Sequence, residues 1–503
     1  MNSFLILINE SAVSRTKIHN VKKNFYITTT LPYLNADPHM GHALEFIQAD
    51  IIARYHRLKG DEVIFNTGTD EHGLKIFQKA LDNNLPTKDY VDLYAMRFRA
   101  LKEKLNLSYT NFIRTTDPHH IQAAQEFWKR CFKNGDIYKG EYEMKYCVGC
   151  ELEKDETELE DGRCFIHPNL EIQIIKEENY FFKFSKYQQK LLDLYTTQPD
   201  FVVPQSRLGE IKSFVERGLK DFSISRLKSK MPWGIPVPDD EEHVMYVWFD
   251  ALVNYVSTLG WPEDEQNFEK WWGTKELPNA FQIAGKDNLR QQSAMWQAML
   301  MSAGLPTSKQ IFIHGFITSE GQKMSKTLGN VIDPLAVADE YGIDALRYFL
   351  ARHIHPFEDS DFTIERFKDS YTANLTNGLG NLVARVMQMA TTHFQGPVEI
   401  TQETKPDTSV SAHIEAFEFN RAMDSIWERI GHNDALIEIK KPFVGIKSGE
   451  ESIRNEALLI IKKLVRELNA IATDLEPFMP STSAQIKEAV LTHKKPDNLF
   501  PRL

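Results

Sequence analysis

The stretch LPYLNADPHMGH, residues 31–42, lies between a β-rich run and a helical pattern. The run before it, FYITTT at 25–30, is typical of a buried strand. After it, apolar residues recur at helical spacing from Leu44 to Leu58, and Gly60 supplies a stop signal. The sequence therefore predicts a strand, a loop and a helix in this order.

The two histidines of this stretch, His39 and His42, are predicted to lie in the first turn of that helix. The N–H groups and positive dipole end of a helix N-terminus bind anions. Imidazole donors at the same place suit a polyphosphate. A capping turn with two incidental histidines is the plain alternative, and the pair alone leaves both interpretations open.

Composition limits the class of protein. A chain of 503 residues has room for two to four domains, and its 26% charged and 42% hydrophobic residues are ordinary for a globular protein. No apolar run approaches the roughly 20 residues that span a membrane. The net charge of −11 argues against a general nucleic-acid coat, though not against a partner recognised through a few contacts. Four cysteines indicate a reducing compartment, and we expect a cytoplasmic protein. For the basic start of the chain, a short presequence stays open beside an unstructured segment.

Polar residues follow two further strand candidates. Val63 to Phe65 runs into NTGTDEHG at 66–73, and a strand beginning at Phe281 ends in AGKD at 284–287. Such residues mark the ligand edge of a doubly wound α/β sheet. Asp70 is either a substrate ligand or a helix cap. The glycine turn before Asp287 would let a nucleotide approach, with Asp287 on a ribose hydroxyl.

A cluster of soft ligands lies between these strands. Cys147 and Cys150 frame CVGC, and Cys164 and His167 follow after a short loop. Two such pairs can close a tetrahedral site around one Zn²⁺, which is structural because protein fills all four positions. A redox pair at Cys147 and Cys150 is the alternative, but no βαβ context surrounds it. Cys131, on a helical pattern, is expected to be a buried apolar residue.

Two lysines, Lys323 and Lys326, lie in GQKMSKTLGN at 321–330. A glycine-bracketed loop with two lysines makes a mobile cationic clamp that neutralises charge on a departing phosphate. A solvated surface loop is the alternative.

Beyond about residue 368 the pattern is helical. Asn377, Asn381 and Arg385 are each four residues apart and lie within about 80° on an α-helical wheel. A stripe of amide and guanidinium donors fits exposed bases, whereas a solvated face is the plain alternative.

Together these motifs resemble the class I aminoacyl-tRNA synthetases, whose signatures are an HIGH-type and a KMSKS-type motif. Within the class, the chain looks like the zinc-containing, bacterial-type methionyl-tRNA synthetase family. The marks are PYLN at 32–35, TGTDEHG at 67–73, WFDAL at 248–252 and KMSKTLGNVIDP at 323–334. The resemblance covers about residues 22–500.

The resemblance implies a Rossmann-like, doubly wound parallel-sheet catalytic domain with a zinc-binding insertion, followed by an all-α anticodon-binding bundle. The expected divisions are a variable N-terminal segment at 1–21, a first catalytic half at 22–135, the insertion at 136–243, a second catalytic half at 244–309, the KMSKS-type loop and linker at 310–367, and the bundle at 368–503.

The implied reaction is that of a methionine–tRNA ligase. L-methionine reacts with ATP, carried with Mg²⁺, to give methionyl-adenylate and pyrophosphate, and the methionyl group then passes to the 3′-terminal adenosine of tRNA(Met), including the initiator. His39, His42, Lys323 and Lys326 would stabilise the reacting phosphates. The resemblance further places ATP on Gly41, Glu45 (adenine side), Gly285 and Asp287 (ribose). No protein nucleophile is needed.

For methionine, the resemblance implies that Asp70 binds the ammonium group and that Leu31 adds a backbone contact. Arg226 would pair with the acid at position 70. An apolar wall for the thioether would comprise Tyr33, Trp248, Ala251, Leu252 and Tyr255, and homocysteine is an expected misfit. Asn377, Asn381, Arg385 and Phe443 would contact the anticodon.

Two positions depart from the family pattern. Gln291 and Gln292 stand where an aromatic residue and a histidine are usual, and Gln292 is expected to donate a hydrogen bond toward the sulfur, with altered selectivity or affinity. Phe443 replaces a tryptophan and is expected to stack less strongly on an anticodon base.

Rival predictions remain within and outside the enzyme class. Valine, leucine and isoleucine enzymes carry a long editing insertion for which this chain has little room, and a cysteine enzyme would place zinc in its amino-acid site. An inactive paralogue that only binds RNA or another protein would not need His39, His42, Lys323 and Lys326. With no extra tRNA-binding module expected, a monomer is the default.

Overall fold

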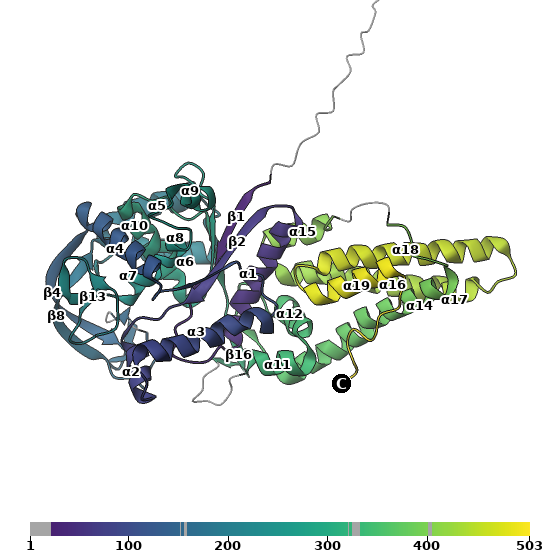
Figure 1. The fold of residues 1–503 in the computed structure, drawn as a ribbon, viewed down its shortest axis with the longest axis horizontal. Coiled ribbons are helices and arrows are strands. Elements are labelled where there is room, and N and C mark those ends of the chain that lie inside the picture. Colours follow the sequence, from purple (N-terminus) through teal and green to yellow (C-terminus); the bar gives the residue numbers. More distant parts are fainter. Residues whose placement is uncertain (1–21, 151, 155–157, 320, 324–331, 401–404) are drawn as a thin grey trace, which may run out of the picture.

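The computed structural model of the chain describes residues 22–150, 152–154, 158–319, 321–323, 332–400 and 405–503. An α/β body lies at one end of an elongated molecule, and the helices of the C-terminal third extend from it (Figure 1). In the described part of the chain, no helix has both the length and the apolar character needed to cross a lipid bilayer.

A six-stranded sheet forms the centre of the body. Its order is β3-β2-β1-β14-β15-β9, and every neighbouring pair is parallel. The strands are β1 (Asn24–Thr28), β2 (Glu62–Thr69), β3 (Asn111–Arg114), β9 (Val202–Val203), β14 (Ala280–Gly285) and β15 (Gln310–His314). The doubly wound parallel sheet predicted from the sequence is confirmed.

Successive residues of β1 enter two different cores, as the two-residue period of a strand requires. Phe25 and Ile27 pack in one core with α1 (Met40–Leu58) and α3 (Thr87–Lys104). Tyr26 packs in the other with α4 (Pro118–Lys133) and α10 (Trp296–Ala303). A strand buried on both faces explains the near-continuous apolar run at its start. The remaining helices of the body are α2 (Leu74–Asp82), α5 (Gln188–Thr197), α6 (Gln205–Glu216), α7 (Val247–Ala251), α8 (Asn254–Ser257) and α9 (Glu265–Trp272).

The next two strands along the chain, β2 and β3, lie on one side of β1 in the sheet. Strands β14 and β15 lie on its other side, so the strand order reverses at β1. Ligands of doubly wound folds bind at the carboxyl edge of the sheet beside such a reversal. The loops after β1, β2, β14 and β15 all open at this edge.

A second, antiparallel sheet lies within residues 136–243. Its order is β10-β8-β4-β5, and all of β8 pairs with β4, from Gln173 opposite Tyr146 to Phe182 opposite Ile137. The strands of this region are β4 (Ile137–Cys147), β5 (Leu152–Glu153), β6 (Leu159–Glu160), β7 (Arg163–Cys164), β8 (Gln173–Phe182), β10 (Phe222–Ser223), β11 (Ser225–Leu227), β12 (Pro236–Val237) and β13 (Asp240–Met245). The expected insertion is not continuous, because β9 lies inside this range and pairs with β15 of the central sheet. A strand of two residues has no periodicity that a sequence pattern could reveal.

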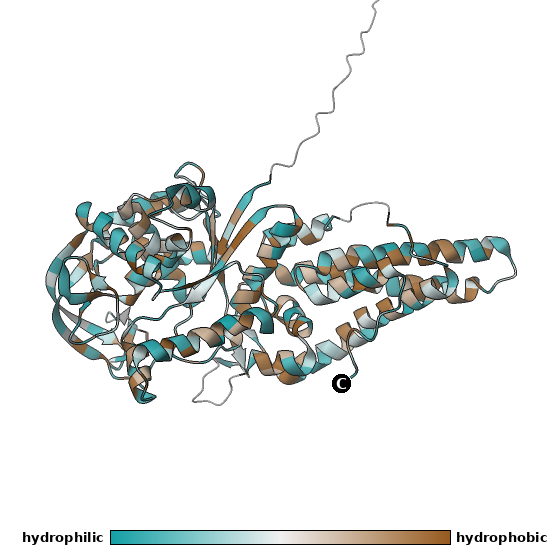
Figure 2. Cartoon of the chain, in the orientation of Figure 1, coloured by the Kyte–Doolittle hydropathy of each residue, from teal (hydrophilic) through white to brown (hydrophobic). Residues whose placement is uncertain are grey.

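Helices make up most of the rest of the chain, with apolar and polar residues interspersed along each of them (Figure 2). They are α11 (Pro334–Tyr341), α12 (Ile343–Arg352), α13 (Ile364–Ser370), a π-helix at Tyr371–Gly380, α14 (Asn381–His393), α15 (Thr408–Glu415), α16 (Phe419–Lys440), α17 (Pro442–Gly445), α18 (Glu451–Leu475) and α19 (Pro480–Thr492). A small sheet has the order β17-β16-β18: β16 (Ile317–Ser319) and β17 (Gln322–Lys323) come before α11 in the chain, and β18 (Ser360–Asp361) lies between α12 and α13. The apolar faces of these helices share one continuous core with α1 and β1, so the helical part is packed onto the α/β body.

Candidate functional site

The two histidines of the opening stretch cap helix α1. His39 is the N-cap residue, one position before the first turn where the sequence placed it, and its Nδ1 accepts the N–H of Gly41 at 3.1 Å. His42 Nδ1 accepts the N–H of His39 at 3.2 Å. The two rings stack with their centroids 3.8 Å apart. The two histidines are therefore capping groups, and they lie where a helix N-terminus attracts anions.

These contacts fix which ring nitrogen carries the proton. Because each Nδ1 accepts a backbone N–H, each neutral ring carries its proton on Nε2. Burial, followed by the nearby charge of His39, lowers the pKa of His42 well below its ordinary value. A Cβ at Gly41 would lie 2.9 Å from the Cε1 atom of His39, so glycine leaves the space that this ring fills.

Glu45, one turn further along α1, is held by three hydrogen bonds. Its Oε1 accepts the backbone N–H of Thr30 at 2.7 Å and the Thr30 hydroxyl at 2.6 Å. Its Oε2 lies 3.0 Å from Nε2 of His314, the last residue of β15. Sequence reasoning did not single out His314, because its contact with Glu45 joins residues 269 positions apart.

The glycine turn after β14 adjoins the same histidine. Gly285 and His314 are register partners between β14 and β15. A Cβ at Gly285 would lie 2.8 Å from Asp287 Oδ1 and 3.6 Å from Cε1 of His314. Asp287 itself is exposed. A side chain at position 285 would therefore displace the Asp287 carboxylate and come into ordinary contact with the His314 ring.

The segment after β1 runs beside the segment after β2. Tyr33 and Asp70 form a parallel bridge, with the N–H of Asp70 donating to the carbonyl of Pro32 at 3.0 Å. Asp70 is only 2% exposed, and half-buried Leu31 precedes this bridge. The ring of Tyr33 meets that of Trp248 edge-on at 6.0 Å. The structure thus joins Tyr33 to both Asp70 and Trp248.

A second group of expected methionine ligands surrounds Tyr255. Ala251, Leu252 and Tyr255 are all buried, and Gln292 donates from Nε2 to the Tyr255 hydroxyl at 2.5 Å. Gln292 lies in a short π-helix, Gln291–Met295, a form of helix that is frequent at functional sites. Its Oε1 is buried, and no described residue donates a hydrogen bond to it.

A close contact between two buried side chains ties these two groups together. His72 Nδ1 lies 3.2 Å from Asp250 Oδ2, and the two side chains are 6% and 0% exposed. Asp250 belongs to α7, which also carries Trp248, and His72 follows Asp70 by two residues. Burial raises the pKa of Asp250, although the charge of His72 opposes this. No local sequence pattern relates His72 to Asp250, so their contact was not predicted from the sequence.

Arg226, expected beside Asp70, is buried within the region of the antiparallel sheet, where its guanidinium lies 5.4 Å from the ring centroid of Tyr146. Its Nη1 donates to the Ser223 hydroxyl and to the Ser225 carbonyl, and its guanidinium lies 4.4 Å from the ring centroid of Tyr246. The expected pairing of Arg226 with Asp70 stays a prediction.

The lysine loop is described only at its base. Lys323 ends β17, whereas Lys326 lies outside the described residues. Asp361 of β18 accepts hydrogen bonds from the N–H of Gly321 and the hydroxyl of Thr318, both at 2.9 Å. These bonds fix the first end of the loop beside the catalytic body.

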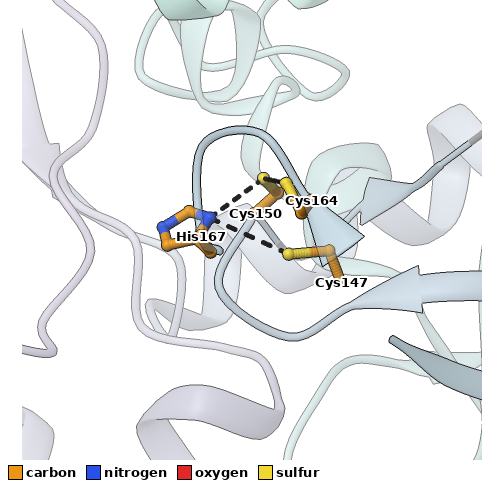
Figure 3. Close-up of side chains that lie close together, drawn as sticks. All are labelled: Cys147, Cys150, Cys164 and His167. Atoms are coloured by element: carbon orange, nitrogen blue, oxygen red, sulfur yellow. Dashed lines mark hydrogen bonds between the residues drawn. The ribbon is translucent and has the colours of Figure 1, made fainter. Parts of the chain in front are cut away.

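Cys147, Cys150, Cys164 and His167 converge in one cluster (Figure 3). Their ligand atoms all lie within 4.8 Å of one another, with His167 Nδ1 3.2 Å from Cys150 Sγ and 3.8 Å from Cys147 Sγ. Ligand atoms of tetrahedral zinc, with Zn–S of about 2.3 Å and Zn–N of about 2.1 Å, lie about 3.5 to 3.8 Å apart. Burial and the neighbouring thiols raise the pKa of Cys150 to about 12, a cost that a divalent cation would offset. The four residues therefore fit a metal ion. Cys131 is buried, as expected.

The expected anticodon residues lie on the helical part. Asn377 and Asn381 are exposed, and Phe443 is 41% exposed at the start of α17. Arg385 is half-buried and donates to Glu438 at 2.6 Å. The α-helical wheel does not hold across 377–381, because 371–380 is a π-helix whose wider turns change the angle between residues four apart.

Comparisons with known proteins agree with this arrangement. The family model of class I tRNA synthetases (M) matches residues 25–156 and 149–387. The methionine–tRNA ligase of Thermosynechococcus vestitus is 42% identical over 481 residues, which cover 92% of this chain and 89% of that protein. The chloroplastic/mitochondrial methionine–tRNA ligase of Arabidopsis thaliana is 40% identical, covering 92% of this chain and 77% of that protein. A structure of Mycobacterium tuberculosis methionyl-tRNA synthetase in complex with methionyl-adenylate superposes with a TM-score of 0.86 at 34% identity, covering 95% of this chain and 100% of that one. The chain therefore belongs to the methionyl-tRNA synthetase family of class I aminoacyl-tRNA synthetases.

Proposed function

We propose that this chain activates L-methionine with ATP to methionyl-adenylate and pyrophosphate and then transfers the methionyl group to the 3′-terminal adenosine of tRNA(Met), including the initiator. The observation that carries the proposal is the convergence of the capping histidines, Asp70, and the Gly285 turn at one edge of the central sheet, in a chain of this family.

The phosphate part of the site is built on the N-terminus of α1. With Nδ1 of His39 and His42 occupied by backbone N–H groups, their Nε2–H groups are the donors that meet the ATP phosphates. His42 stays neutral because burial lowers its pKa, so it donates without titrating near neutral pH. Donors held in place before the reaction stabilise the charge that develops as pyrophosphate leaves. Lys323 and Lys326 would add positive charge to the same phosphates, and Mg²⁺ would arrive with ATP.

Gly41 and Gly285 would border ATP, while Asp287 would take the ribose and Glu45 the adenine side. Glu45 retains acceptor capacity, because an ionised carboxylate has about four lone-pair positions and the chain fills three of them. The methionine carboxylate attacks the α-phosphate directly, so the protein positions the reactants and stabilises charge.

Methionine would bind between the Tyr33–Asp70 bridge and Tyr255. Asp70 would take the ammonium group, supported by Arg226, and the backbone of Leu31 would add a contact. Tyr33, Trp248, Ala251, Leu252 and Tyr255 would enclose the thioether. The Tyr255 hydroxyl accepts from Gln292, so its own proton remains available to face the sulfur.

The Cys₃His cluster is proposed to hold one structural Zn²⁺. A bound zinc ion would cross-link the end of β4 to β7 and the loop after it. All four positions of the tetrahedron would be filled by protein, which assigns the ion to stability rather than to the reaction.

The division into two catalytic halves, an insertion, a linker and a helical bundle is proposed with the expected bounds, except that β9 within 136–243 belongs to the central sheet and 1–21 lies outside the described residues. On the bundle, Asn377, Asn381, Arg385 and Phe443 would meet the anticodon. A monomer is proposed as the working unit. The cysteines among the described residues are all unpaired, which supports a reducing location, and we propose the cytoplasm.

ATP–pyrophosphate exchange with methionine and with a panel of other amino acids tests the activity. We expect methionine-dependent exchange, followed by charging of tRNA(Met). His42→Asn keeps a cap acceptor at the Nδ1 position but loses Nε2–H, and we expect kcat to fall about 10²–10³-fold. His56→Asn, near the far end of α1, is the matched control and is expected to retain exchange. Absence of exchange with methionine would overturn the proposal, and exchange with cysteine or leucine instead would redirect it.

A further inference from the structure

Glu45 and His314 form a buried pair that links helix α1 to the end of strand β15. His314 Nε2 lies 3.0 Å from Glu45 Oε2, and the two side chains are 6% and 10% exposed. On its other side, His314 Nδ1 lies 2.7 Å from the carbonyl oxygen of Gly315. The ring is therefore held from both nitrogens.

These two partners determine the charge of the ring. A carbonyl oxygen only accepts, so Nδ1 carries a proton, and an ionised carboxylate also only accepts, so Nε2 carries one as well. Burial by itself would lower the pKa of His314. The hydrogen bond to Glu45 and its charge, the Gly315 carbonyl and the charge of Asp287 together outweigh burial and raise this pKa above its ordinary value. The charged groups acting on the ring come from α1 and from the turn after β14.

The same ring borders both parts of the proposed nucleoside site. On one side it holds Glu45, whose other oxygen is fixed by Thr30 at the end of β1. On the other side it lies beside the Gly285 turn, where a Cβ would come within 3.7 Å of its Nε2. One imidazole thus contacts the adenine-side carboxylate and lies beside the ribose-side turn, whose Gly285 is its register partner.

We propose that His314 is a positioning residue for the adenosine part of ATP, whose imidazolium holds the Glu45 carboxylate and supports the Gly285 turn before the nucleotide binds. This inference rests on the proposed function, because it assigns the nucleoside to ATP. Because the ion pair orders these side chains before the nucleotide binds, less of the binding free energy is lost in ordering them.

Two substitutions separate the two contacts of the ring. In His314→Gln the amide nitrogen takes roughly the place of Nε2 and keeps a neutral bond to Glu45. In His314→Asn the amide nitrogen takes roughly the place of Nδ1 and keeps only the bond to Gly315. Adenosine is the probe, since it has no phosphate groups that titrate near neutral pH or meet His39 and His42.

Calorimetric titration with adenosine over a range of pH is expected to separate the three proteins. The wild-type affinity should fall as the pH rises above 6.5 through the raised pKa of His314, because the charged ring is present only below that pKa. His314→Asn should bind about tenfold more weakly at low pH, since a bond to a charged group is lost, and His314→Gln should recover part of the affinity with a flat pH profile. In exchange assays the KM for ATP should rise in His314→Asn and rise less in His314→Gln. The KM for methionine should stay near the wild-type value in both variants.

The outcomes distinguish this inference from the proposed function. If the wild type binds neither adenosine nor ATP, the proposed function itself fails. If it binds adenosine and His314→Asn keeps the same affinity and pH profile, the positioning role is wrong. Should His314→Asn not fold, the comparison of wild type with His314→Gln decides, because identical pH profiles in these two proteins also overturn the role.

Discussion

At the scale of single residues, Gln292 and Tyr255 form a unit that should act on methionine and not on ATP. Tyr255→Phe removes the oxygen to which Gln292 donates and leaves a buried amide without that partner, a loss of about 1–3 kcal/mol. We expect the KM for methionine to rise about tenfold or more, with the KM for ATP unchanged. Gln292→Leu should have a similar effect, and the double variant should be little worse than either single one. Fully additive effects in this cycle would show that the hydrogen bond is not used.

The sequence located residues that carry a motif and missed those that act through distant contacts. His39, His42, Asp70 and Gly285 follow strands in a recognisable order, so their place at the carboxyl edge was predictable. His314 and Asp250 are single residues whose partners, Glu45 and His72, lie far away along the chain. Only packing brings such pairs together, and a local pattern cannot encode it.

At the scale of elements, the Cys₃His cluster depends on a glycine between its first two cysteines. A Cβ at Gly149 would lie 2.5 Å from Cγ of His167, closer than packed atoms approach. Gly149→Ala should therefore displace this ligand, and metal analysis after dialysis against a weak chelator should find well under one zinc ion per chain. Gly140→Ala is the matched control on β4, because its Cβ would lie no closer than 3.6 Å to its neighbours. Equal zinc content in the two variants would contradict the predicted role of His167.

Elements with long patterns were predictable, and short or unusual ones were not. The helix expected from the apolar pattern between Leu44 and Leu58 matches α1, which ends at Leu58 before Gly60. In contrast, β9 has only two residues. The segment 371–380 is a π-helix, which has more residues per turn than the α-helical wheel assumes. Neither has a local pattern from which an α-helical or two-residue period could be read.

At the scale of the whole molecule, one buried arginine connects the catalytic helix to the helical part. The fully buried Arg347 of α12 donates to the carbonyls of Pro477 and Phe478 and pairs with Asp50 of α1 at 2.8 Å. Burial would raise the pKa of Asp50, but Arg347, Arg54 and Ser108 outweigh it and lower this pKa. The pair thus contributes stability above the ordinary carboxyl pKa of 3.8, and the contribution is lost as the pH falls through the lower, folded value.

Arg347→Met should leave Asp50 buried with one guanidinium fewer and cost about 3–5 kcal/mol in the free energy of unfolding near neutral pH. Lys104→Met is the control, since its pair with Asp339 also joins two helices but lies exposed, and it should change little. The apolar core runs without interruption from β1 and α1 into α18 and α19, so the variant should still unfold in a single urea transition with a lower midpoint. The difference from wild type should shrink in acid, as Asp50 is protonated. Two separated transitions would instead show that Arg347, rather than the shared core, holds the helical part on the catalytic body.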